Sequence, residues 1–152
     1  MIEAIPANSV IVLNDTRVIA GRLIGHLETG GKIEIFLIRQ EQNSEWIALG
    51  RPLKKLKIGT TINFEDNISA VVTNKQTTAD DSQFLNIEFS KANAYLMPWL
   101  DKNGFIPLPP YIKRTDPAKA PESTDRERYQ TVYAKTNGSV AAPTAGLHFT
   151  DE

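Results

Sequence analysis

The first ninety residues are dominated by short segments in which apolar and polar side chains alternate. Alternation with a period of two places the apolar side chains on one face of a β-strand. In segment 61–65, for example, Ile62 and Phe64 fall on one side. The expected strands are 18–20, 23–24, 32–38, 45–49, 61–65, 68–73 and 84–89, with a hairpin turn at Gly30-Gly31. Short strands at this spacing predict a mostly β fold, a small antiparallel barrel or sandwich over about residues 20–90.

A different pattern occurs at Val10–Leu13, where four apolar residues follow one another. Such a run is typical of a strand that is buried on both faces, and it needs cover on both sides. Almost nothing precedes it, and residues 150–152 have the features of a helix start with no helix body after them. We therefore expect the chain to be a truncated segment of a larger protein.

The second half of the chain has fewer strand signals. Residues 92–100 show a weak helical pattern that contains Pro98 and that Gly104 would end. A proline-rich extended segment follows at 107–111, then a polar loop at 113–127, and residues 128–133 are expected to form one more strand.

The composition excludes several kinds of site and of protein. The absence of cysteine excludes disulfides and thiolate metal sites, no metal-ligand cluster is visible, and no apolar run is long enough to span a membrane. A formal net charge of −1 provides no overall attraction to nucleic acid, so RNA contact requires a local patch. The densest basic cluster comprises Arg51, Lys54, Lys55 and Lys57. It is either a phosphate-binding surface or a solvated turn.

Four sequence blocks carry a family resemblance. They are Leu13-Asn14-Asp15-Thr16-Arg17-Val18, Pro107-Leu108-Pro109-Pro110-Tyr111-Ile112, Arg128-Tyr129-Gln130-Thr131-Val132-Tyr133-Ala134 and Ala141-Ala142-Pro143-Thr144-Ala145-Gly146-Leu147-His148-Phe149-Thr150. In this order and spacing the chain resembles the S-adenosylmethionine:tRNA ribosyltransferase-isomerase family of queuosine biosynthesis. Differences from the family pattern at Gly21, Leu53 and Ile58 fall in loops.

The resemblance implies a small antiparallel β-domain inserted into a larger α/β barrel-type catalytic domain. On that basis residues 1–19 and 113–152 would flank the insertion and belong to the truncated catalytic domain, and residues 20–112 would form the inserted domain. It also implies a cytoplasmic enzyme, expected to be a monomer, whose partner is tRNA. The enzyme would use S-adenosylmethionine as ribosyl donor and no metal. The competing interpretations are a β-barrel RNA-binding module without catalysis and a purely structural or protein-binding domain.

The resemblance also marks candidate catalytic residues. His148 is a candidate for general acid–base work or adenine binding, although a histidine packed beside Phe149 fits the residues equally well. Arg17 is a candidate for holding a carboxylate or phosphate, and Asp15 for binding a ribose hydroxyl. The alternative is a salt-bridged turn in which Asp15 accepts hydrogen bonds from backbone N–H groups.

The candidate substrate-binding residues are Asn14, Thr16, Tyr111, Tyr129, Thr144, Ala145 and Gly146. The tyrosine rings would stack on a base or on adenine, or they would pack the junction between domains. The small residues at 144–146 form a turn whose backbone N–H groups would face a substrate carboxylate, or the turn only connects a strand to a helix.

Overall fold

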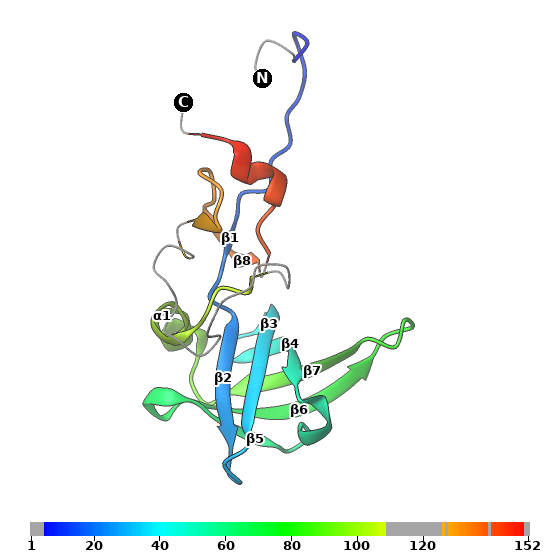
Figure 1. Cartoon of the computed structure of the whole chain (residues 1–152), viewed down its shortest axis with the longest axis vertical. Helices are drawn as coiled ribbons and strands as arrows, with labels where there is room; N and C mark the ends of the chain where they lie inside the picture. Colours follow the sequence, from blue (N-terminus) through cyan, green and yellow to red (C-terminus); the bar gives the residue numbers. More distant parts are fainter. Residues whose placement is uncertain (1–4, 109–125, 127, 140, 151–152) are drawn as a thin grey trace.

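A closed antiparallel barrel forms the body of the molecule (Figure 1). The computed structural model describes residues 5–108, 126, 128–139 and 141–150. In barrel order the strands are β2 (Arg22–Leu27), β3 (Lys32–Gln42), β4 (Glu45–Arg51), β7 (Gln83–Phe89), β6 (Ser69–Thr77) and β5 (Thr61–Asn63). The predicted mostly β, barrel-like fold is confirmed.

Inward-facing apolar side chains fill the barrel, as the alternation predicts. Ile33, Ile35 and Leu37 of β3 are all fully buried. Leu56 follows the short 3-10 helix η2 (Leu53–Lys55) and enters the core beside Gly50. A Cβ atom on Gly50 would lie only 2.2 Å from Cδ1 of Leu56. Gly50 therefore permits the close approach that closes this part of the barrel.

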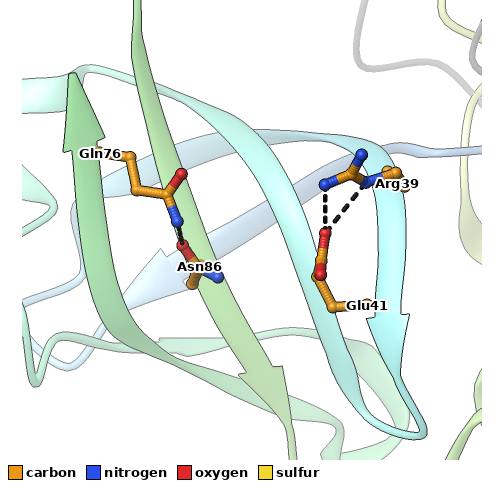
Figure 2. Close-up of polar contacts among 4 residues, drawn as sticks. All are labelled: Arg39, Glu41, Gln76 and Asn86. Carbon is orange, nitrogen blue, oxygen red and sulfur yellow. Dashed lines mark hydrogen bonds and ion pairs between the residues drawn. The ribbon is translucent and has the colours of Figure 1, made fainter. Parts of the chain in front are cut away.

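Side chains on the outer surface of the barrel form polar contacts with one another (Figure 2). Gln76 Nε2 donates to Asn86 Oδ1 at 2.9 Å, across the pair β6–β7. Arg39 donates from Nε (2.9 Å) and Nη2 (2.5 Å) to Glu41 Oε1 along β3. Such exposed contacts each contribute little, so the buried core carries most of the stability.

Helix α1 (Asn93–Asn103) packs beside β2 and covers one side of the barrel (Figure 1). Its residues Leu96, Trp99 and Leu100 join the barrel core. Pro98 lies on the exposed face, so the proline leaves these core contacts intact, and Gly104 donates to Leu100 O at 2.8 Å where the helix ends. The expected helix is confirmed and extends to residue 103. Among the described residues, no helix is both long and apolar enough to cross a membrane.

Two predicted strands are wrong, and the one expected at 18–20 is displaced, because β1 covers Thr16–Val18 and β2 begins at Arg22. Val10–Leu13 forms no strand, and its side chains are 88, 56, 89 and 46% exposed, because no described element lies alongside to supply ladder hydrogen bonds or cover. Arg128 is helical, and residues 129–133 form turns and a bend. The additional strand is instead β8 (Thr136–Ser139), which pairs in parallel with β1 (Figure 1).

Some expectations fall outside the described part of the chain. These are the extended segment beyond Leu108, most of the polar loop at 113–127, and the acidic residues 151–152 of the expected helix start. Within that loop, Arg126 is described, and its guanidinium donates to Asp101 O and, at 2.8 Å, to Gly104 O. A cation placed at the C-terminal carbonyls of α1 stabilises that helix end.

Candidate functional site

All four sequence blocks contribute to one small apolar cluster beside the barrel. Val18, Ala20, Ile106, Tyr129 and Ala142 are buried together there, and Leu108 and Leu147 pack against them. We call these seven residues the junction cluster. Since the first and last blocks are more than a hundred residues apart in sequence, only the fold brings them together.

Strand β1 is held in the junction by contacts on both of its edges. The N–H groups of Lys135 and Thr136 donate to Asp15 O at 2.7 and 3.2 Å, next to the parallel pair β1–β8. The Gln130 side chain accepts from Val18 N–H at 2.9 Å and donates to Val18 O at 2.8 Å. A side-chain amide thus takes the place of a neighbouring strand, because it carries the same donor and acceptor as a peptide group.

Gln130 was absent from the sequence-derived candidates, although it lies within one of the four blocks. A glutamine between two aromatic positions carries no local signal for this role, because its partner, Val18, is 112 residues away.

Two charged side chains of the first block have no partner among the described residues. Asn14 Oδ1 accepts from Thr16 N–H at 2.9 Å, so Asn14, and not Asp15, satisfies the backbone of this turn. The side chains of Asp15 and Arg17 are exposed and make no hydrogen bond or ion pair to any described residue. The salt-bridged turn considered above is therefore not what this part of the structure shows.

The fourth block contains the five-residue 3-10 helix η4 (Thr144–His148). Gly146 N–H donates to Pro143 O at 2.7 Å, so this amide is not open to a substrate carboxylate. Thr144, Ala145 and His148 are exposed.

Gly146 is buried against the third block. A Cβ at this position would lie 2.2 Å from Tyr133 Oη and 2.8 Å from Thr131 Cγ2. The Tyr133 ring meets Phe149 edge-to-face with centroids 5.7 Å apart. Thr131 is 5% exposed, and its Oγ1 has no hydrogen-bond partner among the described residues. The third and fourth blocks are therefore packed tightly enough that only glycine fits at residue 146 without displacement.

Only one of the two candidate tyrosines lies within the described residues. Tyr129 is 7% exposed and packs in the junction cluster. Tyr111 lies outside the described residues.

The basic cluster lies elsewhere, on the connection that follows β4. Arg51 ends that strand, Lys54 and Lys55 belong to η2, and Lys57 follows, and all four side chains are exposed. The Arg51 guanidinium lies 5.9 Å from the centroid of the Phe36 ring. None of the four forms an ion pair with a described residue, so their charges are available to an anionic partner. Within the described ranges, no group of three or more His, Asp or Glu side chains could hold a metal ion.

Comparison with known proteins identifies the family. The family model described as queuosine biosynthesis protein matches residues 1–152. The chain belongs to this family. It is 46% identical to the S-adenosylmethionine:tRNA ribosyltransferase-isomerase of Citrifermentans bemidjiense, over 93% of this chain and 39% of that protein. Its identity to the enzyme of the same name from Finegoldia magna is 44%, over 100% of this chain and 41% of that protein.

A solved structure is also similar to part of the chain. The S-adenosylmethionine tRNA ribosyltransferase of Thermotoga maritima is 29% identical, with a TM-score of 0.44, over 54% of this chain and 27% of that one. The chain thus spans about 40% of the length of the curated relatives it matches.

Proposed function

We propose that the chain forms part of an S-adenosylmethionine:tRNA ribosyltransferase-isomerase. Such an enzyme transfers the ribosyl group of S-adenosylmethionine to the aminomethyl-deazaguanine base at the wobble position of tRNA. The ribose becomes an epoxycyclopentane, adenine and methionine leave, and the product is epoxyqueuosine-tRNA. The proposal rests on one observation: the four blocks that carry the family resemblance meet in the junction cluster.

Three exposed side chains beside this cluster are proposed to act on the substrate. Arg17 would hold a carboxylate or phosphate, Asp15 would bind a ribose hydroxyl, and His148 would transfer a proton or bind adenine. The free state of Arg17 and Asp15 supports this assignment, because an unpaired charge exposed beside the junction has no structural role to fulfil among the described residues. Asn14, Thr16, Tyr111, Tyr129, Thr144, Ala145 and Gly146 are proposed to shape the substrate site around them.

The barrel is proposed to be the inserted domain, residues 20–112, with residues 1–19 and 113–152 belonging to the catalytic domain. The strands close the barrel within residues 22–89, whereas the junction cluster draws on both flanks. Arg51, Lys54, Lys55 and Lys57 would contact tRNA phosphates. We expect the enzyme to work in the cytoplasm as a monomer, without a metal.

A second candidate function is RNA binding without catalysis, which is favoured by a basic cluster that forms no ion pair with the described residues. The test is adenine release from S-adenosylmethionine with substrate tRNA, measured for the complete protein and for this chain alone. We expect release only by the complete protein, because an active site must hold its reacting groups in register and misplacement by about 1 Å costs on the order of a hundredfold. Turnover by this chain within tenfold of the complete protein would contradict that expectation.

Within the complete protein, Arg17→Ala should slow adenine release by about tenfold or more, since it removes a charged hydrogen-bond donor to the substrate. The matched control is Arg39→Ala, which removes another exposed arginine, from the barrel, and should leave turnover unchanged. Absence of adenine release by the complete protein would overturn the proposed reaction and leave the RNA-binding interpretation.

A further inference from the structure

A cavity of about 500 Å³ opens in the barrel wall between β2, β5 and α1. Its lining residues are Leu23, Ile24, His26, Asn63, Phe64, Glu65, Trp99, Lys102, Asn103 and Phe105. None of them belongs to the four blocks or to the basic cluster. The cavity is therefore a feature of the barrel that the proposed reaction does not account for.

The cavity exists because β5 is too short to cover β2. The pair β2–β5 begins only at His26 opposite Asn63, while Arg22 exchanges two hydrogen bonds with Phe105 at 3.0 and 2.8 Å. In an antiparallel ladder, backbone groups point to the same edge at every second residue. Ile24, midway between Arg22 and His26, thus directs its N–H and C=O to this edge, and no described strand lies opposite. The wall offers one backbone donor and one acceptor.

The side chains around the cavity combine aromatic walls with polar groups, several of which have no partner among the described residues. Phe64 and Trp99 meet edge-to-face with centroids 5.9 Å apart, and Phe105 lies at the β2 side. His26 and Asn63 make no side-chain hydrogen bond to any described residue, although both line the cavity. The indole N–H of Trp99 is buried and also lacks a partner among the described residues.

This composition matches a flat heteroaromatic ring with a hydrogen-bonding edge. Binding sites for small molecules typically occupy about 300–1,000 Å³, with apolar and aromatic walls and a few polar groups that set orientation. Nucleobases have these properties, since every base has a π-face for stacking and an edge of donors and acceptors.

Positive charge leads from the cavity toward the basic cluster. His26 lies directly opposite Lys32 in the pair β2–β3. Next to Lys32 in the hairpin is Gly31, and Lys55 Nζ lies 3.3 Å from the position that a Cβ would take on Gly31. Lys32 and Lys55 therefore connect the cavity rim to Lys54 and its neighbours. If a base of an RNA strand entered the cavity, Lys32 and Lys55 would lie close enough on this side to bind the adjoining phosphates.

On the other rim, the charge left unpaired among the described residues is negative, because the lining residue Lys102 is paired with Asp66. Glu65 belongs to the cavity lining, and the adjacent Asp66 is bound by Lys102 at 3.5 Å and by Asn103 at 3.3 Å. The carboxylate of Glu65 has no partner among the described residues, so it would repel phosphate and accept hydrogen bonds from base amino groups. The asymmetry of charge directs a phosphate backbone to the lysine side.

We propose that this cavity binds one unpaired base of an RNA strand while Lys32, Lys55 and the basic cluster hold its phosphates. The proposal rests on the proposed function in that RNA is the ligand. A free nucleoside has the same ring chemistry, but it would not use the adjoining lysines.

The test compares two fluorescently labelled strands at low salt by anisotropy: a short unstructured RNA and an abasic ribose–phosphate strand of equal length. The chain should bind the base-bearing strand about 5- to 150-fold more tightly, the range for stacking of one base. Replacing Lys54 and Lys55 with glutamate should weaken the binding of both strands.

Two variants fill the cavity with a large ring, at positions whose side chains make no hydrogen bond to a described residue. His26→Trp acts from β2 and Asn63→Trp from β5, and each should remove the preference for the base-bearing strand. The matched control, Leu49→Trp, adds the same ring at an exposed position on β4 and should keep the preference. Unfolding midpoints close to the wild-type value would establish that each variant is folded.

If the two nucleic-acid strands bind with equal affinity, and the binding of each still depends on Lys54 and Lys55, the cavity proposal is wrong. RNA contact by the basic cluster would then still stand. Binding of neither strand would overturn both ideas for this chain. If adenosine or S-adenosylmethionine binds and His26→Trp blocks it, while the strands bind equally, then the ligand is a free nucleoside and the proposal is wrong.

Discussion

Replacing Gly146 with alanine should displace Tyr133 and loosen the contact between the third and fourth blocks. The added methyl group would lie 2.2 Å from Tyr133 Oη and 2.8 Å from Thr131 Cγ2, whereas ordinary contacts begin at 3.4 Å. The backbone at Gly146 does not have the positive φ that favours glycine, so the effect is steric. The overlap with the hydroxyl is about 1.2 Å, more than small adjustments absorb in a packed site.

Overpacking of this kind lowers the free energy of unfolding by about 1–3 kcal/mol. This loss includes the weakening of the edge-to-face contact between Tyr133 and Phe149. Tyr133→Phe removes the closest atom, after which the next atom of that ring lies 3.2 Å from the methyl position. On its own this change should cost little, because the hydroxyl makes no hydrogen bond to a described residue. Because the contact with Thr131 Cγ2 at 2.8 Å remains, the double variant should recover part of the loss, a coupling typical of residues in direct contact.

Amide hydrogen exchange measures this effect locally. Ala134 N–H donates to Thr131 O at 3.1 Å and Phe149 N–H donates to Gly146 O at 3.2 Å, so both amides report on the packed turn. Gly146→Ala should speed their exchange about 5- to 150-fold, since each 1.4 kcal/mol is about tenfold. Fluorescence of Trp46 and Trp99, both in the barrel core, should stay unchanged. If Tyr133→Phe fails to slow exchange in the Gly146→Ala background, the clash with the hydroxyl is not the cause.

Two further predictions concern single polar contacts. Gln130→Ala should make the Val18 amide exchange about 5- to 150-fold faster, because leaving a buried N–H unpaired costs about 1–3 kcal/mol. Gln130→Glu keeps the oxygen that accepts this hydrogen bond, so the Val18 amide should exchange more slowly than in Gln130→Ala. Equal exchange in the two variants would contradict this role. Hydrogen bonds from the Thr78 hydroxyl, and to a lesser extent from the Ser82 hydroxyl, lower the pKa of Asp80 in the folded state. These bonds therefore stabilise the folded state at pH values above the unfolded-state pKa of Asp80, and this stabilisation is lost as the pH falls through the lowered folded-state pKa. Thr78→Val should raise the pKa of Asp80 in an NMR titration, and an unchanged pKa would show that Thr78 is not the main cause.

The barrel could be predicted because its signal is local. Ile33, Ile35 and Leu37 alternate with polar or half-buried neighbours, and burial of one face of a strand imposes this period of two. The pattern failed at strand ends: β3 continues to residue 42 and β6 to residue 77, beyond their apolar positions. There, pairing with β4 and β7 supplies ladder hydrogen bonds, and no buried side chain is needed.

The two wrong strands have a common physical cause. The run Val10–Leu13 has strand propensity, but propensity says nothing about whether a partner lies alongside. Conversely β8 has the polar sequence Thr-Asn-Gly-Ser, with Gly138 at a φ of 149°, and gives no apolar pattern at all. It is a strand because β1 lies next to it.

The sequence by itself determined the fold class, the family and the four blocks from which the candidate site is built. The tertiary structure alone decided how those blocks meet: that Gln130 binds Val18, that Gly146 packs against Tyr133, and that Arg17 and Asp15 remain unpaired among the described residues. Periodicity along the chain reflects burial of neighbouring residues, which short segments encode locally. Contacts across 112 residues depend on the path of the chain between them, and no local pattern records that path.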